Sequence, residues 1–526
     1  MRGLASLSTD DRMKTLWLFL TAVLGFWQAV TATATLPAPA SAPAPITVTD
    51  APPPGLEDYL RQKMARKRIP GMQVAVVRDG RVVFSGHYGV ANLQDQVAVT
   101  AQSVFSINSA TKTFTGVAIL QLAQDGKLEL DAPISRYLEG LPPTWQSIRV
   151  RQLLNHTSGL PDILVPPRAQ GTGVLVGGGS DEQAWEQVQT LPMDFATGTA
   201  YRYNQTNYAI LGKIIDKLSG QPFTEFIRSR QFAPAGMHAA SFGDSRDVTA
   251  HRAVPYRYPQ GAGSVRAGPL ENAFDEFPAI LRTGAGINAS ADDIALWLLA
   301  LQDGRLLDSE HRAELWSAGK FNDGRPTSWA NGWPVVAREE HPAVAGIGGR
   351  RSAFYVYPQD HLSVVVLTNL AGANPEEFID EIAGFWLPEL SVANGGGLPR
   401  NVKTLRKALI AHDWRDGAAR MTELKRADPE FAVSEDQLNG WGWRLVADEG
   451  KTREGLAVLE LNTVLYPRSA NTYDTLAEAY ALGGQRAAAI HNYQRSLALD
   501  PGNTHAQDEL RKLGATPPSP ATTSRH

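Results

Sequence analysis

Cysteine is absent from this 526-residue sequence, and its absence excludes several kinds of chemistry. Without thiols the chain has no disulfide bonds, no cysteine nucleophile and no thiolate ligand for zinc. A strong charge of one sign is also missing, because 50 basic residues are balanced by 54 acidic ones and leave a formal net charge of -4. That balance gives no basic surface field of the kind that binds nucleic acid, so we expect no nucleic-acid partner.

Two sequence signatures of other hydrolases are missing as well. The chain contains no G-x-S-x-G motif, which marks the nucleophile of α/β-hydrolases, and no H-E-x-x-H motif, which marks many zinc peptidases. Its 11 histidines are scattered along the sequence rather than grouped like metal ligands. We therefore expect no metal and no cofactor.

The N-terminal part of the sequence predicts export. Residues 1–34 contain an apolar run after Met13 with small residues near its end, which is the pattern of a signal peptide, and Met13 is a candidate for the true start. Residues 35–54 are rich in Pro and Ala and predict an extended linker. We expect a periplasmic or secreted protein, with a retained membrane anchor as the alternative.

The next part of the chain alternates between strand and helix patterns. Two β-rich runs flank Asp79 and Gly80, and two more flank residues 359–360, so each pair predicts a β-hairpin. Three segments between them carry apolar residues with helical period: residues 110–124, 206–219 and 290–302. Strands at both ends with helices between predict an α+β domain at residues 55–390 whose terminal strands share one sheet.

A repeat appears in the last part of the chain. Gly450 and Gly484 lie 34 residues apart, as do two prolines, and the helical patterns between them match in register. This region resembles tetratricopeptide repeats, so residues 400–514 are predicted to form an all-α domain, followed by a disordered tail at residues 515–526. We expect such repeats to serve interaction, with a protein partner or with the preceding domain.

Ser109 and Lys112 stand at the start of an apolar helical segment, in "FSINSATKTFTG". One helical turn places both side chains on the same face. Burial lowers the pKa of a lysine, which could then accept the serine proton, and a helix N-terminus favours a developing oxyanion. The spacing alone is weak evidence, because Ser317 and Lys320 share it without an apolar helix, and a serine that caps the helix is the alternative.

The segment "FSINSATKTFTG" resembles the nucleophile motif of the serine β-lactamase and penicillin-binding-protein superfamily, in its class C β-lactamase, DD-peptidase and esterase branch. Two later segments resemble the same branch in the expected order: "VRQLLNHTSGLPD" at residues 150–162 and "ATGTAYRYNQTNYAILGKII" at residues 196–215. The resemblance implies an antiparallel sheet flanked by helices, with an all-helical subdomain. It also implies Ser109 as nucleophile, Lys112 as its base and Tyr203 as a proton relay.

Two positions depart from the pattern of this superfamily. Gln205 stands where asparagine is usual, on a longer arm that keeps an amide. Gly346 stands where a lysine or histidine is usual, so the side chain that would help to bind a substrate carboxylate is missing. We interpret His156, in the second matching segment, as structural rather than catalytic.

The strand that follows Gly346 is expected to line the site. The resemblance implies that Gly348 lies beside the substrate and that the N–H of Gly349 forms the oxyanion hole with that of Ser109. Arg350 or Arg351 could replace the missing charge. Because adjacent residues of a strand point to opposite faces, at most one of the two arginines faces the site, and a solvated pair is the alternative.

Together these residues predict an exported serine hydrolase that forms an acyl-enzyme with a small ester or amide. The candidate substrates are a small-molecule ester, a D-amino-acid peptide and a β-lactam-like compound. A substrate without a carboxylate fits the glycine at 346 best. The alternative is a non-catalytic, penicillin-binding-like protein that recognises a ligand and docks a partner through its repeats.

Overall fold

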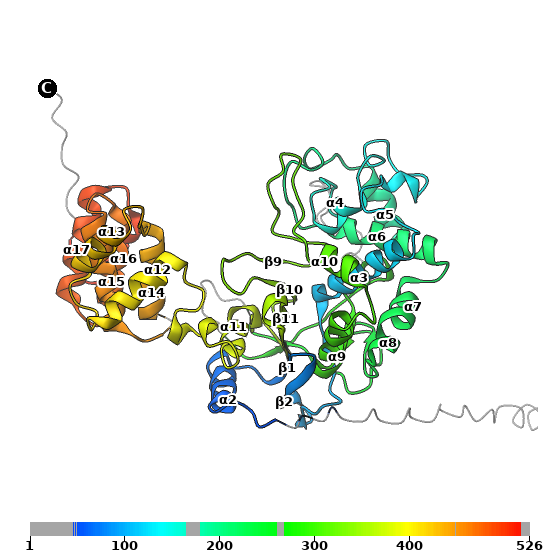
Figure 1. Ribbon diagram of the computed structural model, residues 1–526, viewed down its shortest axis with the longest axis horizontal. Coiled ribbons are helices and arrows are strands. Elements are labelled where there is room, and N and C mark those ends of the chain that lie inside the picture. The colour runs from blue at the N-terminus through cyan, green and yellow to red at the C-terminus, as the bar shows by residue number, and fades with distance from the viewer. Residues whose placement is uncertain are drawn as a thin grey trace, which may run out of the picture. The chain divides into compact units, whose positions relative to one another are not determined.

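The computed structural model describes residues 46, 48, 50–164, 179–259, 268–447 and 449–516 (Figure 1). The predicted signal peptide, most of the predicted linker and nearly all of the predicted tail lie outside these residues. Within the described residues, no helix combines the length and the apolar character needed to cross a membrane.

The described residues of the first domain contain a seven-stranded antiparallel sheet, in which the strands from the two ends of the domain pair with each other. In spatial order the strands are β3 (Val97–Ala98), β2 (Arg81–Asn92), β1 (Gly71–Arg78), β12 (Leu362–Thr368), β11 (Ser352–Tyr357), β10 (Ala343–Gly348) and β9 (Val335–Val336). β1 and β12 pair in the register Val74 opposite Val366. This pairing confirms the α+β prediction of one shared sheet.

Both predicted hairpins are present. β1 and β2 meet at Asp79 and Gly80, whose φ angles of 48° and 76° are the left-handed values that a two-residue type I′ turn requires. β11 and β12 form the second hairpin, around Pro358–Asp360. Each predicted hairpin therefore supplies two neighbouring strands of the sheet.

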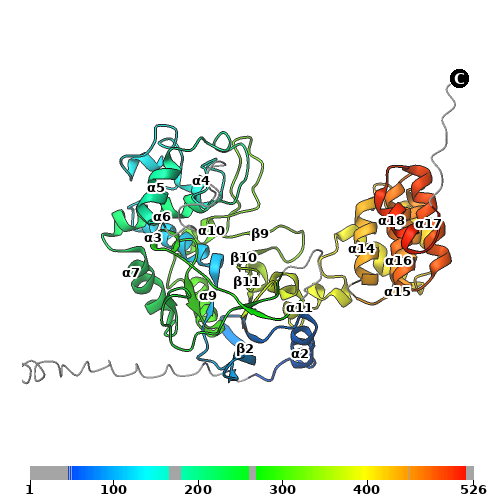
Figure 2. The same ribbon diagram turned by 180° about the vertical axis from the view of Figure 1, so that it is seen from behind.

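Helices cover both faces of the sheet (Figures 1 and 2). On one face, α2 (Leu56–Lys67) and α11 (Ile379–Ala383) bury their apolar residues in a core with Val74 and Val76. On the other face, α3 (Thr111–Gln124) and α9 (Ala291–Gln302) share a core with Ala75 and Val77. α9 begins at a capping box, in which the Oγ of Ser290 accepts a hydrogen bond of 3.0 Å from the backbone N–H of Asp293.

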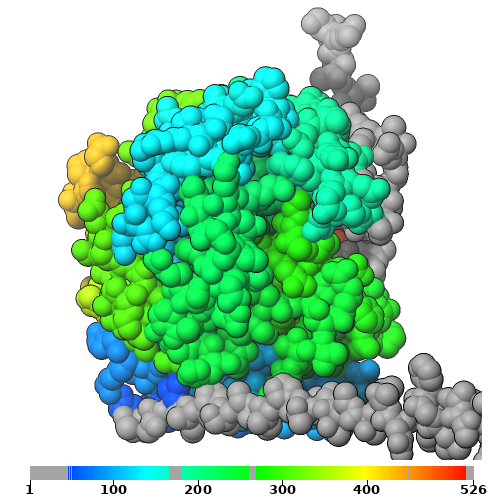
Figure 3. Space-filling view, turned by 90° about the vertical axis from the view of Figure 1, so that its right-hand side faces the viewer, coloured from blue at the N-terminus to red at the C-terminus, as the bar shows by residue number. Residues whose placement is uncertain are grey.

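The long chain segment between β2 and β9 forms a mainly helical region. Its helices are α4 (Val150–Leu154), α5 (Asp181–Gln189), α6 (Gln205–Ser219), α7 (Phe223–Ile227), α8 (Ala233–Ala235) and α10 (Ser309–Leu315). Its short strands are β4 (Phe105–Ser106), β5 (Ser241–Phe242), β6 (Tyr256–Arg257), β7 (Glu271–Asn272) and β8 (Ile287–Ala289), and β13 (Leu370–Ala371) pairs with β6. In Figure 3 this region forms the cyan and green surface of the domain.

The C-terminal part is all helical within the described residues, as predicted. Its helices are α12 (Arg400–Ala411), α13 (Gly417–Ala427), α14 (Glu435–Ala447), α15 (Thr452–Leu465), α16 (Ala470–Leu482), α17 (Arg486–Leu499) and α18 (Thr504–Lys512). α14 and α15 approach closely, since a Cβ added at Gly442 would lie 2.6 Å from Leu459. That these helices are tetratricopeptide repeats stays a prediction.

Candidate active site

Ser109 lies in a short 3-10 turn, η1 (Asn108–Ala110), that leads from β4 directly into α3. Its side chain is half-buried at the end of a helix whose residues are almost all buried. The residue that precedes α3 is Ala110, and no side-chain hydrogen bond caps the helix. Ser109 is therefore not the capping serine of the alternative interpretation, and its Oγ is not used to cap the helix.

Lys112 is completely buried one turn after Ser109. Its Nζ donates hydrogen bonds of 2.9 Å to Oε1 of Gln205 and 2.9 Å to the backbone oxygen of Gly284. Among the described residues no carboxylate lies within ion-pair distance of this Nζ. Lys112 is thus a buried amine held in position by two neutral hydrogen-bond acceptors, an amide oxygen and a backbone carbonyl.

Tyr203 lies directly beside this amine. The Nζ of Lys112 is 4.7 Å from the centroid of the Tyr203 ring, and the Oη of Tyr203 is buried without a hydrogen-bond partner in the described part of the chain. Asn204 then caps α6 by accepting a hydrogen bond of 3.3 Å from the N–H of Asn207, and Gln205 is the first residue of that helix. The helix start therefore brings Tyr203 and Gln205 to the same amine.

His156 packs against Tyr203 from behind, with ring centroids 4.6 Å apart. Its Nδ1 accepts a hydrogen bond of 3.2 Å from the backbone N–H of Asn204. Burial, and next the charge of Lys112, lower the pKa of His156 well below its ordinary value of 6.5. His156 is therefore neutral at pH 7 and supports the loop that carries Tyr203, in line with the structural interpretation.

The end of β10 lies against η1 (Asn108–Ala110), which we call the nucleophile turn because it carries Ser109. A Cβ added at Gly348 would lie 1.9 Å from the backbone oxygen of Ile107 and 2.8 Å from the backbone nitrogen of Ala110, so only glycine fits there. The Oγ of Ser352 ties the two segments together by hydrogen bonds of 2.9 Å to Ile107 O and 3.0 Å to Gly348 O. Gly348 thus lies against Ile107 and Ala110, and Gly349 against Asn108, which are the residues on either side of Ser109.

The two arginines of this hairpin point in different directions. Arg350 is exposed, and its Nε donates a hydrogen bond of 3.2 Å to Asn374 on the outside of the domain. Arg351 is buried, and its Nη2 donates a hydrogen bond of 3.1 Å to Oδ1 of Asn108 and forms an ion pair with Asp275. Arg350 was one of the two candidates for the missing charge. Its side chain points to Asn374 instead, because Arg350 has a left-handed backbone, at φ 54°, in the turn between β10 and β11.

Sequence reasoning missed Gly284 and Asn108. Gly284 supplies a carbonyl to Lys112 and lies just before the predicted helical segment at residues 290–302. Asn108 precedes Ser109 in the left-handed conformation, at φ 48°. A polar residue that tolerates positive φ directly before a nucleophile was the available signal for Asn108.

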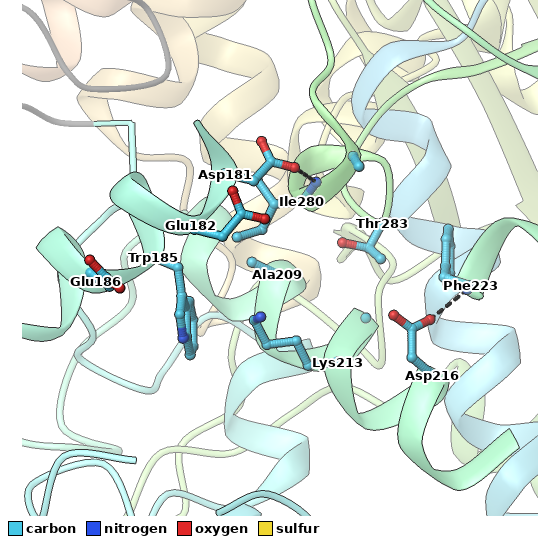
Figure 4. Close-up of a pocket in the computed structure, with 12 residues that line it drawn as sticks. Asp181, Glu182, Trp185, Glu186, Ala209, Lys213, Asp216, Phe223, Ile280 and Thr283 are labelled. Atoms are coloured by element: carbon cyan, nitrogen blue, oxygen red, sulfur yellow. Dashed lines mark hydrogen bonds between the residues drawn. The ribbon is translucent and has the colours of Figure 1, made fainter. Parts of the chain in front are cut away.

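One cavity in the described part of the domain is lined by none of Ser109, Lys112 and Tyr203. It has a volume of about 350 Å³ and lies between α5, α6 and the 3-10 turn η4 (Ala279–Leu281) (Figure 4). In Figure 4, Asp216 points to Phe223, whose N–H it binds, while the amine of Lys213 lies 4.5 Å from the centroid of the Trp185 ring. Asp216 and Lys213 thus serve contacts within the domain, and this cavity is not the proposed catalytic site.

Protein flp of Staphylococcus aureus strain N315 is 26% identical over 326 residues, which make up 60% of this chain and 62% of that protein. The chain thus spans less than two thirds of the length of this relative. Two solved structures share the fold. The octameric penicillin-binding protein homologue from Pyrococcus abyssi has a TM-score of 0.54 and 23% identity, over 67% of this chain and 81% of that one.

The second structure is EstCE1, a hydrolase with promiscuous acyltransferase activity. It has a TM-score of 0.53 and 21% identity, over 62% of this chain and 97% of that one. A family model described as Beta-lactamase matches residues 56–385, which hold Ser109, Lys112, Tyr203 and the whole sheet. Because this match covers more than half of the chain, the protein belongs to the beta-lactamase family.

Proposed function

We propose that this protein is an exported serine hydrolase that forms an acyl-enzyme with a small ester or amide. The observation that carries the proposal is the buried Nζ of Lys112, which lies one turn after Ser109 and is held by Gln205 and Gly284 beside the Tyr203 ring. A buried amine next to a serine at a helix start is the arrangement that can take the proton of a nucleophile.

Acylation would begin when Oγ of Ser109 attacks the substrate carbonyl and its proton passes to the Lys112 amine. The carbonyl oxygen becomes an oxyanion, which accepts hydrogen bonds from the backbone N–H groups of Ser109 and Gly349. The bond to the leaving group then breaks, and the unpartnered Oη of Tyr203 relays the proton to it. Water attacks the serine ester by the reverse sequence and releases the acid and the free serine.

The substrate class follows from the missing charge at residue 346. β-Lactams and D-Ala-D-Ala peptides present a carboxylate, which a cation at that position would bind. In this chain Arg350 points outward, and Arg351 is already paired with Asp275. A neutral ester or amide therefore fits the site better than a carboxylate-bearing substrate.

Labelling with a fluorophosphonate probe and hydrolysis of p-nitrophenyl butyrate test the proposal. We expect stoichiometric labelling and turnover by the wild-type protein, and neither by Ser109→Ala. Ser317→Ala is the matched control, because Ser317 has the same spacing to a lysine but is exposed, as Lys320 is. Absence of labelling in the wild type, or undiminished labelling of Ser109→Ala, would overturn the proposal.

Ligand recognition without turnover is the second candidate, and the glycine at residue 346 is the observation that favours it. Such a protein would bind a cell-wall or peptide ligand in the same site and would not hydrolyse esters. The presence of Ser109, Lys112 and Tyr203 together argues for the enzyme, because a binding site needs no buried amine beside a serine. Turnover that depends on Ser109 decides between the two.

We further propose that the C-terminal helices serve interaction, either with a protein partner or by docking on the hydrolase domain. Deletion of residues 400–526 tests the second case. We expect the truncated protein to lose solubility or activity, and full retention of both would exclude docking as a requirement. Export is tested separately by fractionating cells that express the full sequence.

A further inference from the structure

Asn108 makes contacts on both sides of its amide, although the mechanism above does not use it. Its Oδ1 accepts hydrogen bonds of 3.1 Å from Nη2 of Arg351 and 3.0 Å from Oγ of Ser106. Its Nδ2 lies against the turn that joins β10 to β11, where a Cβ added at Gly349 would be only 1.9 Å away. The Asn108 side chain thus lies between the nucleophile turn and the turn that joins β10 to β11, and it is almost completely buried.

The backbone at Asn108 is also constrained. Its φ of 48° lies in the left-handed region, which costs an ordinary residue free energy and which Asn and Gly tolerate best. Gly349, across the contact, has a φ of 58°. Two turns in unusual conformations therefore meet at this amide, one directly before Ser109 and the other at the second proposed oxyanion donor.

The guanidinium of Arg351 is itself held in place. Its Nη2 joins Asn108 to Asp275, and the carboxylate of Asp275 lies 3.6 Å from Nη2 of Arg252. With only 4% of the Arg351 side chain exposed, solvent does not compete for these contacts. Arg351 can therefore fix the orientation of the Asn108 amide, so that Oδ1 faces the arginine and Nδ2 faces Gly349.

We infer that Asn108 is a positioning residue of the acylation site, which holds the N–H groups of Ser109 and Gly349 in register and is itself oriented by Arg351. The inference rests on the proposed function, because register between these two donors matters only if an oxyanion forms between them. The energetic reason is that a small displacement of reacting groups or oxyanion donors costs a large factor in rate.

Asn108→Gly is the decisive variant, because glycine keeps the left-handed backbone and removes only the amide. We expect kcat for p-nitrophenyl butyrate to fall on the order of 10- to 100-fold with KM within about twofold, and the rate of fluorophosphonate labelling to fall by the same factor. Asn374→Gly is the matched control. Asn374 has a φ of 49°, and its amide bonds Arg350 and Glu377 rather than a residue of the turn that carries Ser109.

Substitution of Arg351 gives a second, independent measurement. Arg351→Lys keeps a charge that can still reach Asn108 or Asp275, whereas Arg351→Met does not. We therefore expect kcat of Arg351→Lys to lie between the values of the wild type and of Arg351→Met, with KM little changed in both variants. A purely structural role would change the melting temperature of both variants without changing kcat.

The outcomes separate the two proposals. We expect the Asn374→Gly control to be labelled and to hydrolyse the ester at the wild-type rate. If Asn108→Gly does so too, the positioning role of Asn108 is wrong and the hydrolase proposal stands. If the wild-type protein is neither labelled nor active, the hydrolase proposal fails and takes the positioning role with it. A parallel fall in labelling and kcat for Asn108→Gly alone supports both.

Discussion

The ring of Phe354 occupies the space that a side chain at residue 346 would need. The two residues lie directly opposite each other on β10 and β11, and a Cβ added at Gly346 would be 2.1 Å from Cζ of Phe354. An aromatic ring that leans across a strand to cover a glycine stabilises the pair by cross-strand packing. The absence of a cation at this position is therefore part of the packing of the sheet and not an open gap.

We expect Gly346→Lys to destabilise the protein by about 1–3 kcal/mol, because the new side chain must displace a fully buried ring. It should not increase acylation by benzylpenicillin, since a lysine that competes with the Phe354 ring for the same space has no fixed position at the site. Urea-induced unfolding and penicillin labelling measure the two effects. In the background of Gly346→Lys, Phe354→Ala should cost less stability than it does alone, because the two side chains compete for one space.

A Gly346→Lys variant with wild-type stability and a new affinity for penicillin would contradict this account of the site. It would mean that Phe354 moves aside at little cost. The neutral-substrate preference would then rest on one residue and not on the packing of two strands.

Tyr203→Phe should separate catalysis from stability. The Oη of Tyr203 is buried without a partner in the described part of the chain, so removing it should leave the free energy of unfolding unchanged or slightly higher. The loss of the proton relay should lower kcat by a factor on the order of 10²–10⁴. Steady-state kinetics and urea-induced unfolding on the same preparation give both numbers.

Tyr208→Phe is the matched control for Tyr203→Phe. The Oη of Tyr208 is also buried, but it donates a hydrogen bond of 3.1 Å to the backbone oxygen of Leu154. Its removal should cost about 1 kcal/mol of stability and much less activity than Tyr203→Phe. Equal kinetic effects of the two substitutions would argue against a proton relay at Tyr203.

Gly284→Ala tests the two hydrogen-bond acceptors that hold the Lys112 amine in place. The added Cβ would lie 2.8 Å from Oε1 of Gln205 and 3.1 Å from Nζ of Lys112, so one of the two must shift. We expect kcat to fall about tenfold or more, because the amine loses its fixed position. Gly440→Ala is the control: it lies in α14 with no atom near the added Cβ, and there the change should stabilise by about 0.5–1 kcal/mol.

Much of this architecture was predictable, because local patterns determine it. The Asp79-Gly80 turn, the three helices that match α3, α6 and α9 to within one residue, and the pairing of strands from the two ends of the domain all follow from periodicity and turn chemistry. Ser109, Lys112 and Tyr203 could be proposed from the sequence because each lies in a segment with a recognisable pattern.

The contacts on which the proposed substrate preference rests were not predictable in the same way. Phe354 covers Gly346 because the register of β10 and β11 places them opposite each other, and no local pattern contains that register. Arg351, rather than Arg350, reaches Asn108 because of how one tight turn is made. Gly284 contacts Lys112 across 172 positions of sequence, a pairing that only tertiary packing creates.

The stability of the site should depend on pH through His156. Burial and Lys112 hold its folded-state pKa well below 6.5, so the unfolded chain binds a proton below about pH 6.5 that the folded protein does not. The free energy of unfolding is then fully retained above pH 6.5. It falls as the pH drops below that value, by up to about 1.4 kcal/mol per pH unit, until the pH reaches the lowered folded-state pKa.

His156→Gln removes this titration, because its amide oxygen can still accept the hydrogen bond from the N–H of Asn204 but binds no proton. The variant should be less stable than the wild type at pH 8, since the ring packing against Tyr203 is lost. The difference in the free energy of unfolding between the two proteins should narrow steadily from pH 6.5 to pH 5, because only the wild type loses stability through His156. Urea-induced unfolding at pH 5, 6, 7 and 8 measures it. A stability difference that stays constant over this range would mean that the folded protein protonates His156 as readily as the unfolded chain does. His156 could then not be a neutral support for Tyr203.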